Sequence, residues 1–347
     1  MRIVLTGGGT AGHVIPNLAV IEELKERGIA EILYIGSCEG PEGKMATKAG
    51  VRFEAVKCGK LRRYFSFANF VDFFKVPVGF FQARKILKSF APDKVFSKGG
   101  YVSLPVVMAA KSLGIKTFVH ESDVSVGLAN KLCFRFANKV LLSFEESKSY
   151  LVRKIAGKAF VVGNPVRKNL VLGDSERGRK FLGFDKHRPV LLIIGGSQGA
   201  RQINELVFAC IDELLKKFQV VHVVGRGNIN IGMYRHHYVQ CEYLDEQMPD
   251  VYAICDVVVS RGGANSLAEL AFLNKKVLVI PLEGAGSRGE QGVNGRLFAR
   301  KYGWSILSGE IAAEQFIDGI EMAFDNTLPK IKFENGLKKI VDLLMKT

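Results

Sequence analysis

Residues 190–200 read VLLIIGGSQGA, and residues 3–13 read IVLTGGGTAGH. Each stretch passes from an apolar segment through a glycine-rich turn into a helical segment, which is how a βαβ unit begins. Because the same start occurs in both halves of the chain, the sequence predicts an α/β protein with two doubly wound, Rossmann-like domains. We expect these domains to face each other across a cleft.

A turn-forming Gly-Asn-Pro cluster at residues 163–165 makes a natural linker between the halves. We therefore predict a first domain at 1–163 and a second at 164–327. The stretch 316–345 is expected to be helical, with 328–347 packing back on the first domain. Expected strands of the first domain lie at 3–5, 32–35, 94–97, 117–120 and 140–142, with helices at 17–27 and 103–113. Expected strands of the second domain lie at 190–194, 219–224, 257–260 and 276–280.

The chain of 347 residues carries 49 Lys and Arg against 34 Asp and Glu, a net charge of +15. Such an excess favours anionic partners, among them nucleic acid, acidic lipid and phosphorylated metabolites, although a generically basic soluble protein has the same composition. The sequence has neither an arginine-rich run nor zinc-finger spacing, so we expect no nucleic-acid partner.

Six cysteines are scattered along the chain without a CxxC pair. Several lie in apolar segments, so we expect buried free thiols, which favours the reducing cytosol. The amino terminus becomes glycine-rich after five residues, which indicates a first strand and not a signal peptide. No segment reaches the roughly 18–20 uninterrupted apolar residues that span a bilayer.

The glycine turn at residues 195–200 is predicted to hold a pyrophosphate. Glycine permits positive φ and lets a phosphate approach the N–H groups at the start of the next helix, where the helix dipole favours an anion. The Ser197 hydroxyl is an added donor. A tight turn without a ligand is the alternative. Neither this loop nor the first one is expected to be a GxGxxG or a Walker A loop.

A third glycine loop, residues 260–266, also follows an expected strand and leads into a helix that carries Glu269. A carboxylate one turn inside this helix is able to accept hydrogen bonds from both hydroxyls of a ribose. The alternative is a solvated glutamate that the helix dipole favours near its amino end.

Residues 60–90 read KLRRYFSFANFVDFFKVPVGFFQARKILKSF. Apolar residues recur at helical spacing in this stretch, aromatic residues widen the apolar face, and basic residues flank it. The pattern is typical of a helix at an anionic membrane surface, while packing against the sheet explains part of the stripe. Membrane contact is predicted for Phe73, Phe74, Phe80 and Phe81.

Six motifs occur together in this order: GGGTAGHVIPNLAV, SKGGYVSLP, HESD, VVGNPVR, GGSQGARQIN and RGGANSLAE. In order and spacing they resemble the bacterial MurG family, and the resemblance covers nearly the whole chain. It implies a GT-B fold with the donor in the second domain and the acceptor in the first. It also implies inverting transfer of N-acetylglucosamine from UDP-N-acetylglucosamine to the muramoyl C4 hydroxyl of lipid I, giving lipid II for peptidoglycan. The implied location is peripheral, at the cytoplasmic face of the inner membrane.

The resemblance also implies a set of site residues. Arg167, Ser197, Gln198 and Gly199 would contact the diphosphate, and the backbone at Leu244 the uracil. Glu269 would bond the ribose, while Glu290 and Gln291 would read the sugar. Asp123 stands where the family commonly has asparagine, and Glu290 stands where some members have glutamine. The resemblance therefore does not decide which sugar contacts Asp123 and Glu290 make. The nucleotide would be lined by Ala264, Asn265, Ser266, Leu267 and Ala268, and the transferred sugar and the acceptor pyrophosphate by Thr10, Ala11 and Gly12.

His13 follows the first glycine loop at a helix start, and the ordinary histidine pKa of about 6.5 suits a general base. We hypothesise that it accepts the proton of the muramoyl hydroxyl; the alternative is a histidine that bonds the acceptor pyrophosphate or the backbone. Asp123 and Glu121 are reserve candidates. No DxD motif lies where a metal would clamp the diphosphate, so we expect neither a metal nor a cofactor.

Three other functions share these features. A GT-B transferase with another lipid acceptor, such as diacylglycerol, would have the same donor loops. A UDP-N-acetylglucosamine 2-epimerase has the same architecture but would not need the apolar stretch at 60–90. A basic nucleic-acid-binding protein would show salt-dependent binding to DNA.

Overall fold

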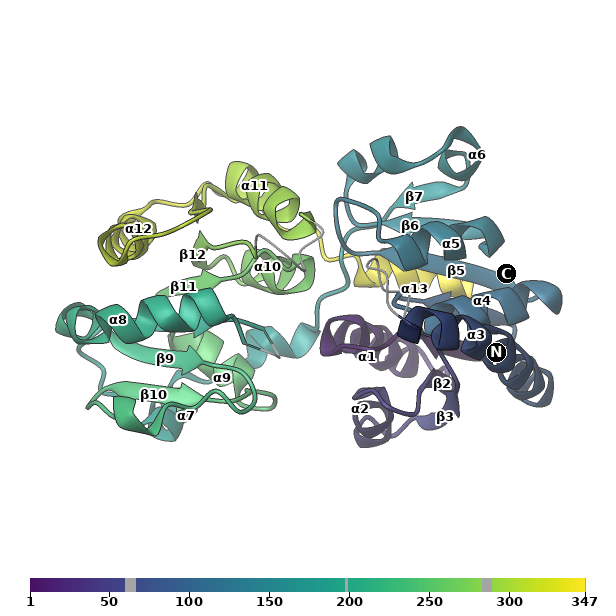
Figure 1. The fold of residues 1–347 in the computed structure, drawn as a ribbon, viewed down its shortest axis with the longest axis horizontal. Coiled ribbons are helices and arrows are strands. Elements are labelled where there is room, and N and C mark those ends of the chain that lie inside the picture. The colour runs from purple at the N-terminus through teal and green to yellow at the C-terminus, as the bar shows by residue number, and fades with distance from the viewer. Residues whose placement is uncertain (60–66, 197–198, 283–288, 347) are drawn as a thin grey trace. The chain divides into compact units, whose positions relative to one another are not determined.

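The computed structural model describes residues 1–59, 67–196, 199–282 and 289–346, and at 67–74 it describes the backbone alone. The chain divides into two compact units (Figure 1). The first unit comprises Met1–Val166 and Glu334–Thr347, and the second comprises Arg167–Phe333. Each contains one parallel sheet with helices on both faces, so the prediction of two doubly wound α/β domains is confirmed.

The first unit has a seven-stranded sheet in the order β3-β2-β1-β4-β5-β6-β7. Its strands are β1 (Arg2–Thr6), β2 (Glu31–Ser37), β3 (Arg52–Val56), β4 (Lys94–Ser97), β5 (Lys116–Glu121), β6 (Lys139–Leu142) and β7 (Ala159–Val161). Its helices are α1 (Ala11–Glu26), α2 (Glu42–Lys48), α3 (Phe67–Phe90), α4 (Ser103–Ser112), α5 (Leu128–Phe136), α6 (Arg153–Ala156) and α13 (Leu337–Met345), with a 3₁₀ turn at Glu145–Tyr150.

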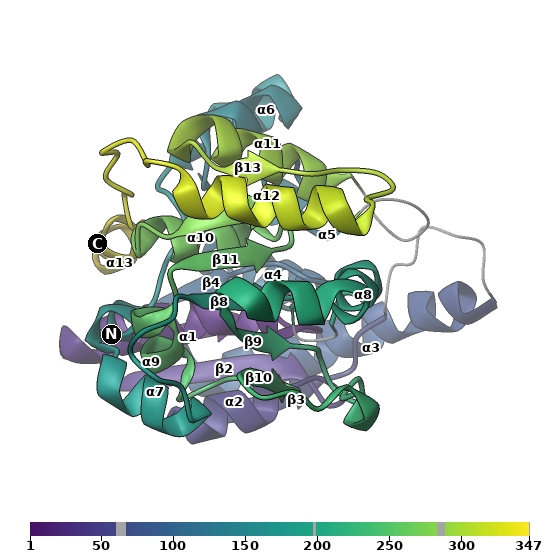
Figure 2. The same ribbon diagram turned by 90° about the vertical axis from the view of Figure 1, so that its left-hand side faces the viewer.

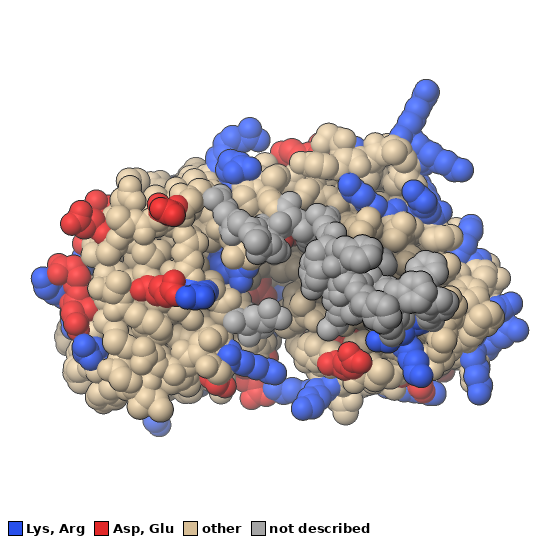
Figure 3. All heavy atoms as spheres, viewed as in Figure 1, with Lys and Arg blue, Asp and Glu red and all other residues tan. Residues whose placement is uncertain are grey.

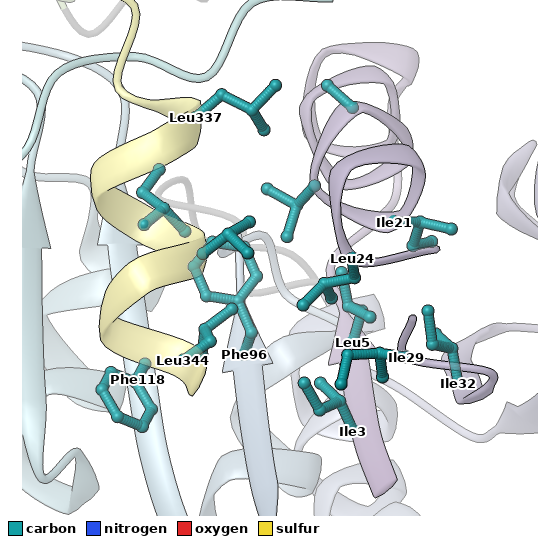
Figure 4. Packing of buried hydrophobic residues seen from close by; sticks show 14 of the residues in the cluster. Ile3, Leu5, Ile21, Leu24, Ile29, Ile32, Phe96, Phe118, Leu337 and Leu344 are labelled. Carbon is teal, nitrogen blue, oxygen red and sulfur yellow. The ribbon is translucent and has the colours of Figure 1, made fainter. Parts of the chain in front are cut away.

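Alternation along β1 divides the core of the first unit between the two faces of the sheet. Ile3 and Leu5 pack toward α1 and α13, whereas Val4 packs toward α3 and α4. Figure 4 shows Leu344 of α13 beside Phe96 and Phe118 of the sheet, and Leu337 at the other end of the helix pointing toward α1. Burying each such side chain contributes about 1.5–3 kcal/mol, so the last helix of the chain belongs to the core of the first unit.

The second unit has a six-stranded sheet in the order β10-β9-β8-β11-β12-β13. Its strands are β8 (Val190–Ile194), β9 (Gln219–Val223), β10 (Tyr238–Cys241), β11 (Val257–Ser260), β12 (Lys276–Val279) and β13 (Ser305–Ile306). Its helices are α7 (Ser175–Leu182), α8 (Arg201–Lys217), α9 (Met248–Ile254), α10 (Ala264–Phe272), α11 (Glu290–Tyr302) and α12 (Ala313–Asp325), with 3₁₀ turns at Lys168–Leu172 and Ile231–Met233. The helices α8 and α12 cover one face, which Figure 2 shows from the front.

Four strands, β3, β7, β10 and β13, were not predicted from the sequence, and all four lie at an edge of a sheet. Their side chains are mostly half-buried or exposed, because an edge strand has a neighbour on one side only. The continuous apolar signal of a central parallel strand is therefore absent from them. The central strands at 94–97, 190–194 and 257–260 were predicted with the bounds that the structure has.

The prediction of a helical stretch at 316–345 is wrong in its middle. The helix α12 ends at Asp325 and α13 begins only at Leu337. Pro329 lacks an N–H, and the Asn335 side chain bonds the backbone of Val166 and Leu337, so the intervening chain is not helical. The first helix also begins at Ala11, earlier than the expected 17.

Among the residues that the structure describes, none of the helices combines the length and the apolar character that crossing a bilayer requires. The six cysteines are all free thiols, three of them buried.

Candidate active site

Each sheet has a switch point, which is the place beside its first strand where the order of the strands along the chain reverses direction. In the first unit it lies between β1 and β4, and in the second between β8 and β11. Ligands of doubly wound folds bind outside the carboxyl ends of the strands at this place. The glycine loops of the sequence analysis all follow one of these four strands.

The loop after β8 turns sharply into α8. Gly196 and Gly199 have φ of +86° and +78°, and a Cβ on Gly199 would lie 2.2 Å from the carbonyl oxygen of Val224. Only glycine fits this position without displacing the backbone of the neighbouring strand. Ser197 and Gln198, to which diphosphate contacts were assigned, lie outside the described residues.

A guanidinium lies against this loop. Nη1 of Arg261 donates to the carbonyl oxygens of Gly195 and Gly199 at 3.1 and 3.2 Å, and its Nε donates to Oε1 of Gln291 at 3.3 Å. Burial lowers the pKa of Arg261 from its ordinary value while Glu290 raises it, and a guanidinium remains charged at neutral pH. The sequence analysis quoted this residue within RGGANSLAE but gave it no role.

Arg167 and Glu269 form an ion pair in the second unit, with Nη2 3.2 Å from Oε1. The Tyr252 hydroxyl donates to Oε2 at 3.4 Å. Burial raises the pKa of Glu269, and the charge and hydrogen bond of Arg167 lower it. Nε of Arg167 is buried and has no hydrogen-bond partner among the described residues, so a ligand oxygen would satisfy it.

The remaining predicted residues of the second unit differ in exposure. Leu244, Ala264, Leu267 and Ala268 are buried, so only their backbone is able to meet a ligand. Asn265 and Ser266 are half-buried at the start of α10. Glu290 and Gln291 begin α11, and Oε1 of Gln291 also accepts from the Leu282 N–H at 3.0 Å. Gln291 and Gly199 thus meet through Arg261.

In the first unit, His13 lies in the first turn of α1, after the exposed Thr10 and Gly12 and the half-buried Ala11. Its Nδ1 lies 3.2 Å from the carbonyl oxygen of Lys98. A carbonyl only accepts, so Nδ1 carries the hydrogen, and the neutral ring has its lone pair on Nε2. This is the tautomer that a base acting through Nε2 needs.

A buried carboxylate lies against the loop after β1. Oε2 of Glu42 accepts from the Gly9 N–H at 3.4 Å, and Oε1 accepts from the N–H and the hydroxyl of Ser37 at 2.9 and 2.6 Å. Residues 7–12 have the GxGxxG spacing, so the prediction that this pattern is absent is wrong for the first loop. A carboxylate therefore lies against Gly9 of the first loop, whereas a guanidinium lies against the loop after β8.

Residues of SKGG, HESD and GNP converge behind the first loop. Nζ of Lys98 donates to Nδ1 of His120 at 2.7 Å and to the Ser122 hydroxyl at 2.5 Å. Glu121, a reserve candidate for the base, accepts from the N–H groups of Asp123 and Gly127 and from Asn130, and is buried among them. That surrounding fits a carboxylate that holds its own loop in place. Asp123 itself is half-buried.

The described residues hold no group of three or more His, Cys, Asp or Glu side chains arranged to bind a metal ion.

Models of glycosyltransferase family 28 match both halves of the chain, its N-terminal domain at residues 3–142 and its C-terminal domain at residues 190–343. The chain belongs to glycosyltransferase family 28. The two family 28 matches begin at the first strand of each sheet, so the family relationship includes the glycine loops of both units.

Relatives of similar length support this placement in family 28. A protein of Lachnoclostridium phytofermentans is 46% identical over 94% of this chain and 91% of its own, and one of Clostridium tetani is 42% identical over 99% and 98%. Both are named UDP-N-acetylglucosamine–N-acetylmuramyl-(pentapeptide) pyrophosphoryl-undecaprenol N-acetylglucosamine transferase.

Solved structures share the fold of this family 28 chain. The crystal structure of MurG from Acinetobacter baumannii superposes with a TM-score of 0.71 at 22% identity, over 100% of this chain and 99% of that one. A UDP-GlcNAc 2-epimerase from Neisseria meningitidis bound to UDP-GlcNAc gives 0.67 at 16% identity, over 100% of both chains. At these identities the likeness concerns the fold alone.

Proposed function

We propose that this chain transfers N-acetylglucosamine from UDP-N-acetylglucosamine to the C4 hydroxyl of the muramoyl sugar of an undecaprenyl-pyrophosphate-linked pentapeptide acceptor. The observation that carries the proposal is the shared name of relatives that are 42–46% identical over nearly the whole chain. The product would be the lipid-linked disaccharide of peptidoglycan synthesis.

The donor diphosphate binds in the second unit. Two loops have the glycine geometry for an anion, but Arg261 lies against the loop after β8 and Glu42 against the loop after β1. Arg261 attracts a diphosphate at the loop after β8, whereas Glu42 already occupies the Gly9 N–H and opposes a diphosphate at that N–H. The helix α8, which is kinked at Cys210, adds the positive end of the dipole of its first segment to the loop after β8.

His13 acts as the general base. Its Nε2 takes the proton of the acceptor hydroxyl while that oxygen forms a bond to the anomeric carbon, and the bond from this carbon to the diphosphate oxygen breaks. UDP leaves with the electron pair of the broken bond, so attack from the opposite side inverts the anomeric centre. Arg167 and the loop after β8 stabilise the negative charge on the departing diphosphate.

The first unit docks on the anionic cytoplasmic face of the inner membrane, as a peripheral protein. It contains 28 Lys and Arg against 15 Asp and Glu, a net charge of +13, while the second unit contains 21 against 19, a net charge of +2. Figure 3 shows Lys and Arg side chains distributed over the visible face of the first unit, on the right. The excess charge therefore supports docking by the first unit.

The helix α3 supplies the apolar part of the docking surface. The Phe81 side chain is 68% exposed, and Val78 one turn before it is 44% exposed. Phe80 is half-buried against the core, so its membrane contact would be partial. The side chains of Phe73 and Phe74 lie outside the described part of the molecule.

The test is to incubate the protein with labelled UDP-N-acetylglucosamine, with and without a lipid-linked muramoyl-pentapeptide acceptor. We expect a labelled disaccharide-lipid only when the acceptor is present. Conversion of the UDP-sugar without acceptor would indicate an epimerase, and transfer to diacylglycerol in place of the muramoyl lipid would indicate a different lipid glycosyltransferase. Either result would overturn the proposal.

A further inference from the structure

A buried lysine follows β4. The Lys98 side chain is 1% exposed, and its Nζ donates to Nδ1 of His120 at 2.7 Å, to the Ser122 hydroxyl at 2.5 Å and to Oδ1 of Asn164 at 3.5 Å. An ammonium has three N–H donors, so three acceptors match it completely. The side chain is anchored on β5, on the residue that follows it and on the Gly-Asn-Pro turn.

The three acceptors are themselves held in place. Nε2 of His120 donates to the Gly163 carbonyl at 3.0 Å, which leaves Nδ1 as the acceptor for Lys98. Asn164 accepts from the Ser143 hydroxyl at 2.8 Å and donates to the Ser122 carbonyl at 3.3 Å. Since all of these side chains are buried, the network holds the lysine in one conformation.

The backbone of the same lysine contacts the first glycine loop and the histidine beyond it. Its N–H donates to the Thr6 carbonyl at 2.9 Å, and its carbonyl accepts from Nδ1 of His13 at 3.2 Å. At Gly100, with φ of +84°, a Cβ would lie 2.4 Å from the Gly8 oxygen and 3.3 Å from Cδ2 of His13. The segment 98–100 thus contacts the imidazole at Nδ1, and it leaves no room for a side chain at position 100, between the Gly8 carbonyl and Cδ2 of His13.

We propose that Lys98 is a positioning residue for His13. The hydrogen-bond network around its Nζ holds its carbonyl where that oxygen keeps the hydrogen of the imidazole on Nδ1 and the lone pair on Nε2. This inference rests on the proposed function in that it takes His13 as the base.

The second unit has a cation at the corresponding place. Residues 260–263 read Ser-Arg-Gly-Gly and residues 97–100 read Ser-Lys-Gly-Gly, and each run lies where a strand adjoining the switch point ends. Arg261 bonds its glycine loop through the side chain, and Lys98 bonds the Thr6 end of its loop and His13 through the backbone. In both units the basic residue connects its own segment to neighbouring parts of the site, through the guanidinium of Arg261 in one and through the backbone of Lys98 in the other.

The chemistry of Lys98 also indicates which substitution the fold will tolerate. Burial lowers the pKa of Lys98 to about 7, against the raising effect of Glu121 and Asp123. Holding a cation at this position is unfavourable, so an unbranched apolar side chain of similar length should keep the unit folded. Lys98→Met is therefore the test variant, and Lys116→Met is the control, because Lys116 is exposed at the opposite end of β5.

The first measurement is the tautomer of His13, read from ring ¹⁵N shifts at pH 7.5 in histidine-labelled protein and assigned with His13→Ala. We expect the wild type and Lys116→Met to hold the hydrogen on Nδ1, and Lys98→Met to shift a measurable fraction to Nε2. An unchanged tautomer in Lys98→Met overturns the proposal. This readout needs no substrate, so it stands whether or not the transferase assay succeeds.

The second measurement is a double-mutant cycle on transfer. Lys98→Met should lower kcat by at least about tenfold, which is less than the loss expected for removing the general base itself. The KM for the UDP-sugar should stay unchanged. Combined with His13→Ala it should add no further loss, because a residue that acts through His13 has nothing left to position. An additional loss in the double variant contradicts the proposal. If Lys98→Met does not fold, Ser122→Ala removes one anchor and is expected to give the same pattern more weakly.

Discussion

Arg167 and Glu269 pair with each other, Nη2 to Oε1 at 3.2 Å, and both side chains are less than a fifth exposed. The two residues are proposed to meet different parts of the donor, the diphosphate and the ribose. Under that proposal the nucleotide would meet two side chains that already pair with each other. The pair holds both groups in place before the ligand arrives, which lowers the cost of ordering them.

Replacing Glu269 by glutamine should weaken UDP binding and reduce the preference for a ribose. A hydrogen bond to a charged group contributes about 1.5–3 kcal/mol, so we expect the affinity for UDP to fall by about 10- to 100-fold. The affinity for 2′-deoxy-UDP should change less, as measured by calorimetry. Glu205→Gln, on the exposed surface of α8, is the control. An equal loss for both nucleotides would show that Glu269 does not touch the ribose.

Replacing Arg261 by methionine should loosen the loop after β8, because the carbonyls of Gly195 and Gly199 lose a shared charged donor. We expect UDP to bind at least about tenfold more weakly. Arg235→Met, in which an exposed ion pair with Asp212 is removed, should bind UDP normally. If both variants bind UDP equally well, the diphosphate does not lie at this loop.

Replacing His13 by alanine should lower turnover by at least about a hundredfold, since general bases contribute factors of that order. The affinity for UDP should stay the same, because the donor loops belong to the second unit. Steady-state rates with saturating lipid acceptor, together with calorimetry on UDP, separate the two quantities. Turnover within a few-fold of the wild type would exclude the role of base.

Replacing Phe81 by aspartate should weaken binding to vesicles of anionic lipid. The side chain is 68% exposed on α3, so the change puts a charge on the docking surface without opening the core. Phe80 is unsuitable for this test because it packs against the core. Phe181→Asp, at a 50% exposed position in the second unit, is the matched control. Equal vesicle binding by the two variants would place the docking surface elsewhere.

The stability of the protein should depend on pH through Lys98. Its pKa is about 7 in the folded chain and 10.5 in its ordinary state, so between these values the unfolded chain binds more protons. The free energy of unfolding then rises with pH between pH 7 and pH 10.5, by at most about 1.4 kcal/mol per pH unit. Below pH 7 the full cost of burying the charged lysine is present. The measurement is the free energy of unfolding in urea for the wild type and for Lys98→Met, each at pH 7 and at pH 9. From pH 7 to pH 9 we expect this free energy to rise more for the wild type than for Lys98→Met. Parallel curves would contradict a buried, titrating lysine.

The fold followed from the sequence where central strands are buried on both faces. The segments at 190–194 and 257–260 are apolar throughout and lead into glycine turns, so strand, loop and helix start were all predicted there. The edge strands β10 and β13 lack this continuous apolar pattern, because each has a neighbouring strand on one side only. The non-helical segment before Leu337 was not predicted. Only a few turn-forming residues, among them Pro329 and Asn335, distinguish an interrupted helix from a continuous one in this stretch.

The sequence by itself determined the glycine loops, their place after parallel strands and the candidacy of His13, because backbone conformation and strand pattern are local properties. Only the tertiary structure decided which charges lie behind the loops: Glu42 in the first unit, Arg261 in the second, and Lys98 behind His13. Those pairings join residues up to 85 positions apart, and such contacts depend on the order of strands in the sheet. No local pattern of residues encodes them.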